Sequence, residues 1–540
     1  MKNETSFFIK GFKHTAFITL LSRISGFIRD IFIATFLGAG IFSDIFLIAF
    51  KLPNLFRRIT AEGALTSAFL PIYTLLIQEK GKSFANDFFI SFLIKAVFYL
   101  SLLLILFELF MPFVIYILAP GFANNDIVTT QIILLSRITI IFMPLISVVA
   151  LLGVITNVSG RFWPIALTPI ILNGCLIISC YFISDIDYLR SLPLAIASVL
   201  AGFLQLIFMI IIIKKFQIFR SKKDDYKNIS NANKIDIKIY LKKTWIKFIP
   251  AAFGGGILQI NILVDTILAS LLGFGSVSYL YFADRIAQLP LGIIGIALST
   301  SLLTSLSKSI ASKNIKQFSN QLLTSFQIGL FFSIPASFVL FFFPDIIISI
   351  LFERGEFGLK EKNATIEALK AYSVGIPAFI ILKSCQPAFL AEGNTKTPMY
   401  IGIVLLILNI ILSLSLMNYF FHAGIALATS LSSWIGCLIY IILLIKNRKI
   451  SLIKDKIYKK SISIFSILIF SLKLIMISSL MILIMKVSLY YFRIYEINKF
   501  VSLIFLIFIG LLIYFLTCGV LRYIPEDLLK KRVSAGKERK

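Results

Sequence analysis

Arginine side chains interrupt the apolar segments of this sequence, where a membrane would make charge costly. Arg23 and Arg29 stand six residues apart in one apolar run, Arg57 and Arg58 near the end of the next, and Arg285 inside a third. A charged side chain at the centre of a membrane helix costs at least about 2.5 kcal/mol, so we expect these groups to face a cavity. Guanidinium groups offer planar, paired donors that suit phosphate oxygens. The pattern therefore predicts a binding site for a phosphate or diphosphate.

Carboxylates in the same segments leave a second interpretation open. Asp30, Asp44 and Glu62 belong to the first two apolar runs, and Asp284 directly precedes Arg285. If each arginine is matched by a neighbouring carboxylate, the charges serve packing alone. The arginines outnumber these carboxylates. We therefore expect positive charge to remain for an anionic ligand.

Two further pairs of polar residues have both a functional and a structural interpretation. Glu62 and Lys383 would form a gate if they met across the mouth of the cavity, and would otherwise reach separately toward the membrane interface. Asp265 and Asn409 would supply oxygen ligands for a monovalent cation or would hydrogen bond between helices. The five cysteines form no CxxC pair and are expected to fill space, so the residues predict no cofactor apart from that candidate cation.

The elements that carry these residues are long apolar blocks. Of the 540 residues 58% are hydrophobic, and the mean hydropathy is +0.94. Blocks of about 20 apolar residues recur almost to the C-terminus, and each is long enough to cross ~30 Å of hydrocarbon as a helix. The sequence therefore predicts an all-α, polytopic membrane protein. We place 14 transmembrane helices near residues 15–37, 43–62, 86–117, 128–156, 162–183, 191–214, 246–272, 276–302, 322–351, 368–390, 398–418, 423–445, 462–487 and 498–521.

Basic residues collect in alternate connections between these blocks. The net charge of +27 lies mainly in such connections, for example 220–243, 308–316 and 446–460. Basic loops remain cytoplasmic, so both termini are expected in the cytoplasm. This distribution accounts for the charge without nucleic acid as a partner.

An internal repeat divides the chain. A shift of 235 positions places Asp30, Ala34, Leu37, Gly38, Gly40 and Ser43 on Asp265, Ala269, Leu272, Gly273, Gly275 and Ser278. Repeats of six helices in the same orientation predict two pseudo-symmetric lobes related by an axis along the membrane normal. We expect lobes at 1–219 and 244–447, a cytoplasmic linker at 220–243, and two additional helices with a tail at 448–540. The linker would be either a surface helix on the inner leaflet or a solvated loop.

Several motifs together carry a family resemblance that extends over essentially the whole chain. They are SRISGFIRD at 22–30, LPNLFRR at 52–58 followed by AEGA at 61–64, APGF at 119–122, GSVSYLYFADRIAQLPLGIIGIAL at 275–298 and NTKTP at 394–398. The chain resembles the MurJ (MviN) family, the lipid II flippases of bacterial cell-wall synthesis. That family belongs to the multidrug/oligosaccharidyl-lipid/polysaccharide exporter superfamily of two-lobed, alternating-access transporters.

The resemblance implies roles for the residues singled out above. Four of the arginines match the family's cavity arginines, namely Arg23, Arg29, Arg57 and Arg285. Asp30 and Asp44 match its acidic cavity positions, and Glu62 with Lys383 its gating pair. The last two helices match those that form a groove for the undecaprenyl tail. Some members have a sodium site at positions corresponding to Asp265 and Asn409. The resemblance also implies lipid II as substrate, membrane lipids and cell-wall synthesis machinery as partners, a monomer, and the bacterial inner membrane as location.

Three rival functions remain open. A drug/cation antiporter of the same superfamily would be expected to have an acidic or aromatic cavity and twelve helices. An enzyme acting on polyprenyl phosphates would need aspartate clusters for Mg²⁺, and the apolar segments contain no DDxxD-like run. A structural partner of the division machinery would not move lipid II. We therefore expect a transporter that carries lipid II from the cytoplasmic to the periplasmic leaflet.

Overall fold

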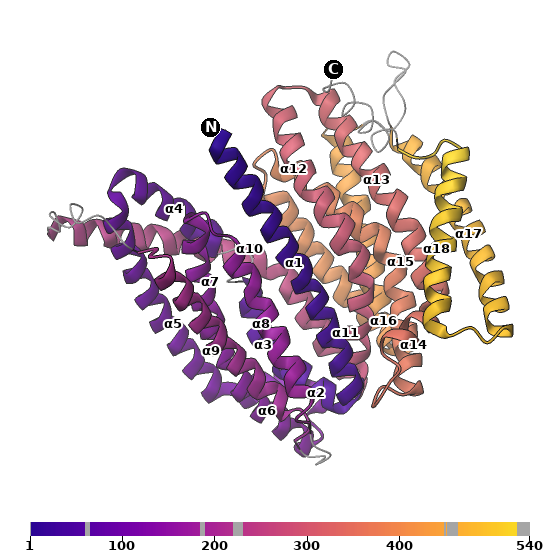
Figure 1. Cartoon of the computed structure of the whole chain (residues 1–540), viewed down its shortest axis with the longest axis horizontal. Coiled ribbons are helices and arrows are strands. Elements are labelled where there is room, and N and C mark those ends of the chain that lie inside the picture. Colours follow the sequence, from indigo (N-terminus) through magenta and orange to yellow (C-terminus); the bar gives the residue numbers. More distant parts are fainter. Residues whose placement is uncertain are drawn as a thin grey trace. The chain divides into compact units, whose positions relative to one another are not determined.

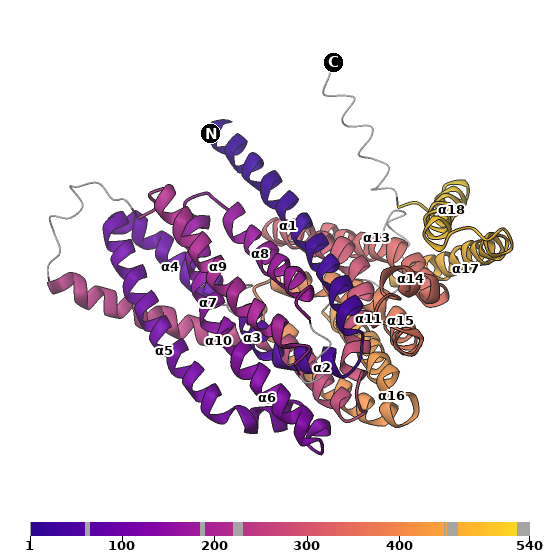
Figure 2. The ribbon, with the colours of Figure 1, turned by 60° about the horizontal axis from the view of Figure 1, so that its bottom comes forward.

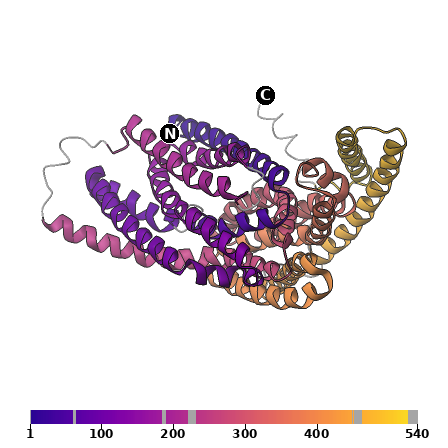
Figure 3. The same cartoon turned by 90° about the horizontal axis from the view of Figure 1, so that it is seen from below.

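The computed structural model describes residues 2–59, 65–183, 189–219, 231–447, 450 and 463–525. Throughout these ranges the regular structure is helical, with no β-strand, which confirms the all-α prediction (Figure 1). The helices form two compact units, one comprising residues 1–278 with 355–357 and the other comprising 279–354 with 358–540. Each unit has its own core of buried apolar side chains. Figures 2 and 3 show the helices in two further views.

The first unit is a bundle of helices that pack in sequence-distant pairs. α8 lies against α1 and α9, α2 against α6, and α10 against α4 and α5. Its elements are α1 (Lys2–Leu37), α2 (Ile41–Ala49), α3 (Lys51–Ile59), α4 (Leu65–Glu79), α5 (Gly81–Leu118), the 3-10 turn η2 (Pro120–Phe122), α6 (Asp126–Ile140), α7 (Phe142–Val158), α8 (Trp163–Cys180), α9 (Leu192–Lys215) and α10 (Asn231–Ser270).

A break separates α2 from α3 at Phe50, next to the candidate arginines. Pro53 lacks the N–H that would bond the carbonyl of Ala49, and its ring would crowd that carbonyl. The hydroxyl of Thr139 in α6 instead donates to the Ala49 oxygen at 2.7 Å. Pro53 and Pro71 each predict a kink in the second apolar segment of the sequence. The kink at Pro53 is present. Pro71, where a second kink was predicted, lies inside the continuous helix α4.

The second unit is built around α15, which packs against α13 and α16. Its elements are α11 (Ser276–Pro290), the π-helical turn η4 (Leu291–Gly295), α12 (Ile296–Ala311), α13 (Ile315–Phe342), α14 (Pro344–Leu351), α15 (Leu359–Leu390), α16 (Lys396–Lys446), α17 (Ile464–Ile494) and α18 (Lys499–Val520). The first turn of α11 belongs to the first unit. α17 packs on α13 and α18, and α18 also on α14, so the two additional helices dock on the second unit.

Ten helices of the described ranges are long and apolar enough to cross a membrane. α5 illustrates the lipid-facing type, because Ile94, Phe98 and Leu109 are 64%, 64% and 70% exposed. Large apolar surfaces of this kind suit hydrocarbon and not water. The polytopic membrane class is confirmed, whereas the count of fourteen stays a prediction.

The 235-residue repeat reappears in the backbone. α2 and α11 begin at Ile41 and Ser276, which are 235 positions apart. Gly38 and Gly273 precede them with φ of 68° and 97°, a region that favours glycine. The contacts of α10 place it in the first unit, although the predicted lobe boundary lay at 220–243, before this helix. The division into transport lobes stays a prediction.

Candidate functional site

Arg29 is held in a buried polar network between α1 and α8. Its Nε and Nη2 donate to Oδ1 of Asp30 at 3.0 and 2.6 Å, and its Nη1 donates to Oδ1 of Asn173 at 3.0 Å. Nδ2 of Asn173 donates to the hydroxyl of Ser25 at 2.8 Å and to the carbonyl of Ser22 at 3.3 Å. Because Asp30 is 2% exposed, this carboxylate compensates Arg29 inside the protein. At this arginine the structure agrees with the interpretation of internal pairing.

Asp44 anchors backbone groups that are distant in sequence. Its carboxylate is fully buried and accepts the backbone N–H of Gly275 at 2.6 Å and of Ser278 at 2.8 Å. These residues form the start of α11, where N–H groups lack helical partners and favour negative charge. Asp44 therefore acts as a helix cap for residues of its own unit. The cavity position implied by the resemblance stays a prediction.

The other candidate arginines of the first unit are half-buried or exposed. Arg57 donates from Nε to Oδ1 of Asn54 at 3.0 Å, one turn away in α3. Arg58 reaches Oε1 of Gln259 on α10 at 3.4 Å, and Arg23 is exposed on α1. The contacts of Arg57 and Arg58 with neutral oxygens orient both side chains.

Arg285 has a different setting in the second unit. Its Nη2 donates to the phenol oxygen of Tyr281 at 3.1 Å, and its Cζ lies 4.6 Å from the centre of the same ring. Asp284 accepts a hydrogen bond from Gln288 one turn along α11. The aromatic face holds the guanidinium by a cation–π contact, which leaves it positively charged.

Lys383, Asp265 and Asn409 lie on three different helices. Lys383 is half-buried on α15, a helix that packs against the π-helical turn η4, and its expected partner Glu62 lies outside the described residues. Asp265 accepts from Nδ2 of Asn261 at 3.5 Å, and the buried Asn409 accepts from Thr429 at 3.4 Å. Asp265 and Asn409 belong to different units, so a shared sodium site stays a prediction. Within the described ranges no three His, Cys, Asp or Glu side chains cluster as metal ligands.

The chain is similar to known proteins over most of its length. The family model described as "Lipid II flippase MurJ" matches residues 33–514, which is most of the chain. The chain belongs to the MurJ family. A probable lipid II flippase MurJ of Rickettsia prowazekii (strain Madrid E) is 38% identical over 422 residues, 78% of this chain and 80% of that protein.

Solved structures support the same placement. The structure titled "Lipid II flippase MurJ, inward closed conformation" is 27% identical, has a TM-score of 0.74, and covers 95% of this chain and 99% of its own. An inward-facing multidrug resistance MATE family transporter of the MOP superfamily is 14% identical, with a TM-score of 0.62, covering 81% of this chain and 98% of its own. At that identity the second likeness shows the fold alone. The family resemblance and the membrane class drawn from the sequence are confirmed.

The roles of the individual site residues stay predictions. The structure also shows contacts of residues that the sequence did not single out. The contact of Asn173 with Arg29 is not visible from their spacing in the sequence. Glu108 on α5 and Arg137 on α6 form an ion pair at 3.9 Å inside predicted membrane segments. Single opposite charges in consecutive apolar blocks were the available signal for that pair.

Proposed function

We propose that this chain moves lipid II from the cytoplasmic to the periplasmic leaflet of the bacterial inner membrane by alternating access. The observation that carries the proposal is membership of the MurJ family over residues 33–514. Relatives that carry the name lipid II flippase support the substrate. Both termini would lie in the cytoplasm, as the basic loops predict.

The arginines would bind the diphosphate of the substrate. Arg57 and Arg58 contact neutral oxygens, and Arg285 lies against the ring of Tyr281. Their guanidinium groups offer the paired donors that suit a diphosphate. Arg29 differs, because Asp30 already compensates it. We therefore assign Arg29 a supporting role, in which it fixes α1 against α8, and assign direct phosphate contact to Arg57, Arg58 and Arg285, with Arg23 at the exposed edge.

The transport step would depend on charge. A ligand shifts a conformational equilibrium only through different interaction energies in the two states. Binding of a diphosphate would neutralise the arginines and lower their mutual repulsion, which favours rearrangement. The headgroup would enter laterally while the polyprenyl tail stays in lipid along α17 and α18. The membrane potential would supply about 2.3 kcal/mol per charge per 100 mV, and sodium bound near Asp265 or Asn409 is a second candidate source of energy.

We propose a transporter without catalytic activity that works as a monomer alongside cell-wall synthesis enzymes. The multidrug transporters of the same superfamily share the fold at low identity, and their cargo is a different chemical class. An arginine-rich site suits an anion and disfavours the cationic drug of an antiporter.

Arg285→Ala tests this function. We expect the variant to fail to sustain growth when the resident lipid II flippase is depleted, because the cation that meets the diphosphate is lost. Arg285→Lys is the matched control, since it keeps charge but loses paired donors and should support partial growth. Native mass spectrometry of the purified variants should show loss of lipid II binding in the same order. Normal growth and binding of Arg285→Ala would refute the proposal.

A further inference from the structure

An ion pair lies on an exposed apolar surface of the first unit, where α5 and α6 pack side by side (Figures 1 and 2). Nε of Arg137 on α6 is 3.9 Å from Oε2 of Glu108 on α5, and the two side chains are 48% and 35% exposed. Ile105, Leu109 and Leu134, which are close neighbours in the same helices, are exposed as well. A large apolar surface of this kind faces hydrocarbon. The pair is therefore exposed to lipid.

Both charges lie near the middle of the membrane. Glu108 stands nine residues before the end of its predicted membrane segment at 117, and Arg137 stands nine residues after the start of the next segment at 128. At 1.5 Å per residue each lies about 14 Å below the periplasmic surface, in a hydrocarbon core of ~30 Å. Charged side chains at this depth draw water and lipid headgroups inward by thinning the bilayer locally.

The contact between Glu108 and Arg137 leaves most of their hydrogen-bonding capacity unused. A guanidinium has five N–H donors and a carboxylate accepts about four bonds. Neither charged group makes a hydrogen bond in the part of the chain that the structure describes. Hydrocarbon supplies no partner for them. A headgroup that carries both a phosphate and an ammonium group supplies both partners, because the phosphate suits the guanidinium and the ammonium group suits the carboxylate.

Hydroxyl groups continue this polar line toward both membrane surfaces. Ser101 lies seven residues from Glu108 on α5, and Thr130 lies seven residues from Arg137 on α6. Seven residues make about two helical turns, so each hydroxyl shares the face of its charged neighbour, about 10 Å away along the axis. Both residues are exposed, and within the described ranges neither hydroxyl is hydrogen-bonded. Polar groups therefore recur at about 10 Å intervals across the membrane.

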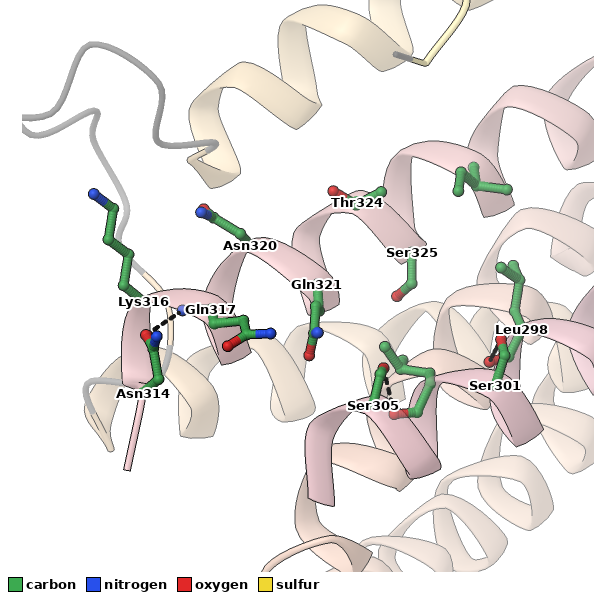
Figure 4. Close-up of a pocket in the computed structure, with 12 residues that line it drawn as sticks. Leu298, Ser301, Ser305, Asn314, Lys316, Gln317, Asn320, Gln321, Thr324 and Ser325 are labelled. Carbon is green, nitrogen blue, oxygen red and sulfur yellow. Dashed lines mark hydrogen bonds between the residues drawn. The ribbon is translucent and has the colours of Figure 1, made fainter. Parts of the chain in front are cut away.

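A polar hollow between α12 and α13 in the second unit differs from this surface (Figure 4). Its volume is about 650 Å³, and amide and hydroxyl side chains line most of it. Gln321 accepts the hydroxyl of Ser309 at 2.9 Å, and Lys316, the charged residue of this described lining, points away from Gln321. The hollow presents no pair of opposite charges to a headgroup. Such a pair distinguishes the surface of α5 and α6.

We infer that the surface of α5 and α6 lets phospholipids with a zwitterionic headgroup, of the phosphatidylethanolamine type, cross between the leaflets. At mid-depth the phosphate meets Arg137 and the ammonium group meets Glu108, while the acyl chains stay in hydrocarbon. The hydroxyls of Ser101 and Thr130 bond the headgroup before and after this point. The crossing runs in both directions and needs no coupling ion. This activity is separate from the movement of lipid II by the arginines.

Vesicles of phosphatidylethanolamine and phosphatidylglycerol that contain the purified full chain test this inference. A trace of phosphatidylethanolamine with a fluorophore on its acyl chain reports the crossing, because added dithionite quenches the fluorophore in the outer leaflet alone. We expect the protein to bring labelled lipid from the inner leaflet to the outer one. Phosphatidylglycerol with the same label lacks the ammonium group and should cross about tenfold more slowly.

Substitutions separate the two charges from the helices that carry them. Glu108→Leu with Arg137→Leu should slow the crossing about tenfold. Glu108→Arg with Arg137→Glu should restore it, because a headgroup with both charges can turn to meet either order.

Lys95→Leu is the matched control for these substitutions. Lys95 is exposed on α5 and lies nine residues from the other end of the same predicted segment, at 86. It stands thirteen positions from Glu108, which places it on another face of the helix. Removal of this charge should change the rate less than about twofold.

Several results would overturn the inference. Equal rates for wild type and the double leucine variant, or for the two headgroups, would show that the pair does not carry the lipid. Failure of the reversed pair to restore the crossing, in a variant that unfolds at the wild-type temperature, would show that these residues serve packing. Dimers cross-linked through Leu109→Cys would show that a second copy covers the surface.

Growth separates this activity from lipid II transport. The double leucine variant should sustain growth when the resident lipid II flippase is depleted, because both substituted residues lie outside the arginine site. Loss of growth together with loss of lipid II binding would assign Glu108 and Arg137 to the transport site and overturn the separate activity.

Discussion

At the scale of single residues, charges in the apolar segments have unequal roles. Arg29 with Asp30, and Asp44 with the backbone of Gly275, are satisfied inside the protein, whereas Arg285 keeps its charge on an aromatic ring. Burying a charge is costly unless it is paired or hydrogen-bonded. The contacts of Arg29 and Asp44 therefore support the scaffold.

Asn173→Ala should weaken the junction of α1 and α8. The substitution removes an acceptor from Arg29 and two donated bonds to α1, and leaving buried partners unsatisfied costs about 1–3 kcal/mol. We expect a lower midpoint of thermal unfolding in detergent. Asn173→Asp is the control, because it keeps the acceptor for Arg29 and should lose less. An unchanged midpoint for Asn173→Ala would contradict this role.

Asp44→Ala tests the capping role directly. The change leaves the N–H groups of Gly275 and Ser278 without their acceptor in a buried site, at a cost of about 1–3 kcal/mol for each. Asp44→Asn retains one acceptor oxygen and should destabilise less. If Asp44→Ala unfolds at the wild-type temperature but loses lipid II binding, the residue belongs to the substrate site and the capping role is wrong.

At the scale of elements, two loop contacts hold helix ends in place. The loop before α15 lies against the connection between α17 and α18, where Lys499 is 3.7 Å from Glu353. The segment 355–357 docks on the end of α1, where the N–H of Glu356 donates to the carbonyl of Thr35 at 2.9 Å. Both contacts join parts of the chain that are more than a hundred residues apart.

The Glu353 contact should depend on pH. The hydrogen bond from Ser349, followed by the bond and charge of Lys362, lowers the pKa of Glu353 below its ordinary value of 4.5. A lowered pKa in the folded state means that the stabilisation is present above that ordinary value and is lost as the pH falls through the lowered one. We expect the backbone amides of the connection between α17 and α18 to exchange hydrogen with solvent faster in acid than at neutral pH, after correction for intrinsic exchange rates. Glu353→Gln should remove this pH dependence, and persistence of the dependence in that variant would contradict the assignment.

Gly355→Ala should detach the docked segment from α1. Gly355 has a φ of 57°, and a Cβ there would collide with the carbonyl oxygen of Thr35. Gly393→Ala is a matched control, since Gly393 has a φ of 74° with nothing within 4 Å of an added Cβ. Both substitutions incur about 1–2 kcal/mol of backbone strain. Any further drop in unfolding temperature for Gly355→Ala, relative to Gly393→Ala, therefore measures the contact between the docked segment and α1. Equal drops would show that the contact contributes nothing.

At the scale of the whole molecule, the chain is a helical membrane protein with an internal sequence repeat and two additional C-terminal helices. α16 shows why helix length alone does not count membrane crossings. Its 51 residues would extend about 76 Å as one straight helix, far beyond a ~30 Å hydrocarbon core. Phe421 has a φ of 49° and interrupts the helix, which fits the two segments predicted at 398–418 and 423–445.

Topology reporters test that division. Fusions of green fluorescent protein and alkaline phosphatase after His422 should report a periplasmic position, and fusions after Lys446 a cytoplasmic one, because the chain crosses once between them. A fusion after Ala311 serves as a second cytoplasmic control. The same cytoplasmic result at His422 and Lys446 would show that α16 does not reverse there and that the count of fourteen needs revision.

The amino-acid pattern was sufficient for the helical membrane class, the break near Pro53, the repeat and the choice of arginines as unusual residues. These features are local, because hydrocarbon imposes length and apolarity on every crossing segment and proline acts on its own helix. The partners of those residues were not predictable. Asn173 meets Arg29 across 144 positions and Gly275 meets Asp44 across 231, and such contacts depend on how helices pack, which no sequence period encodes. The tertiary structure therefore decided which groups Arg29 and Asp44 contact.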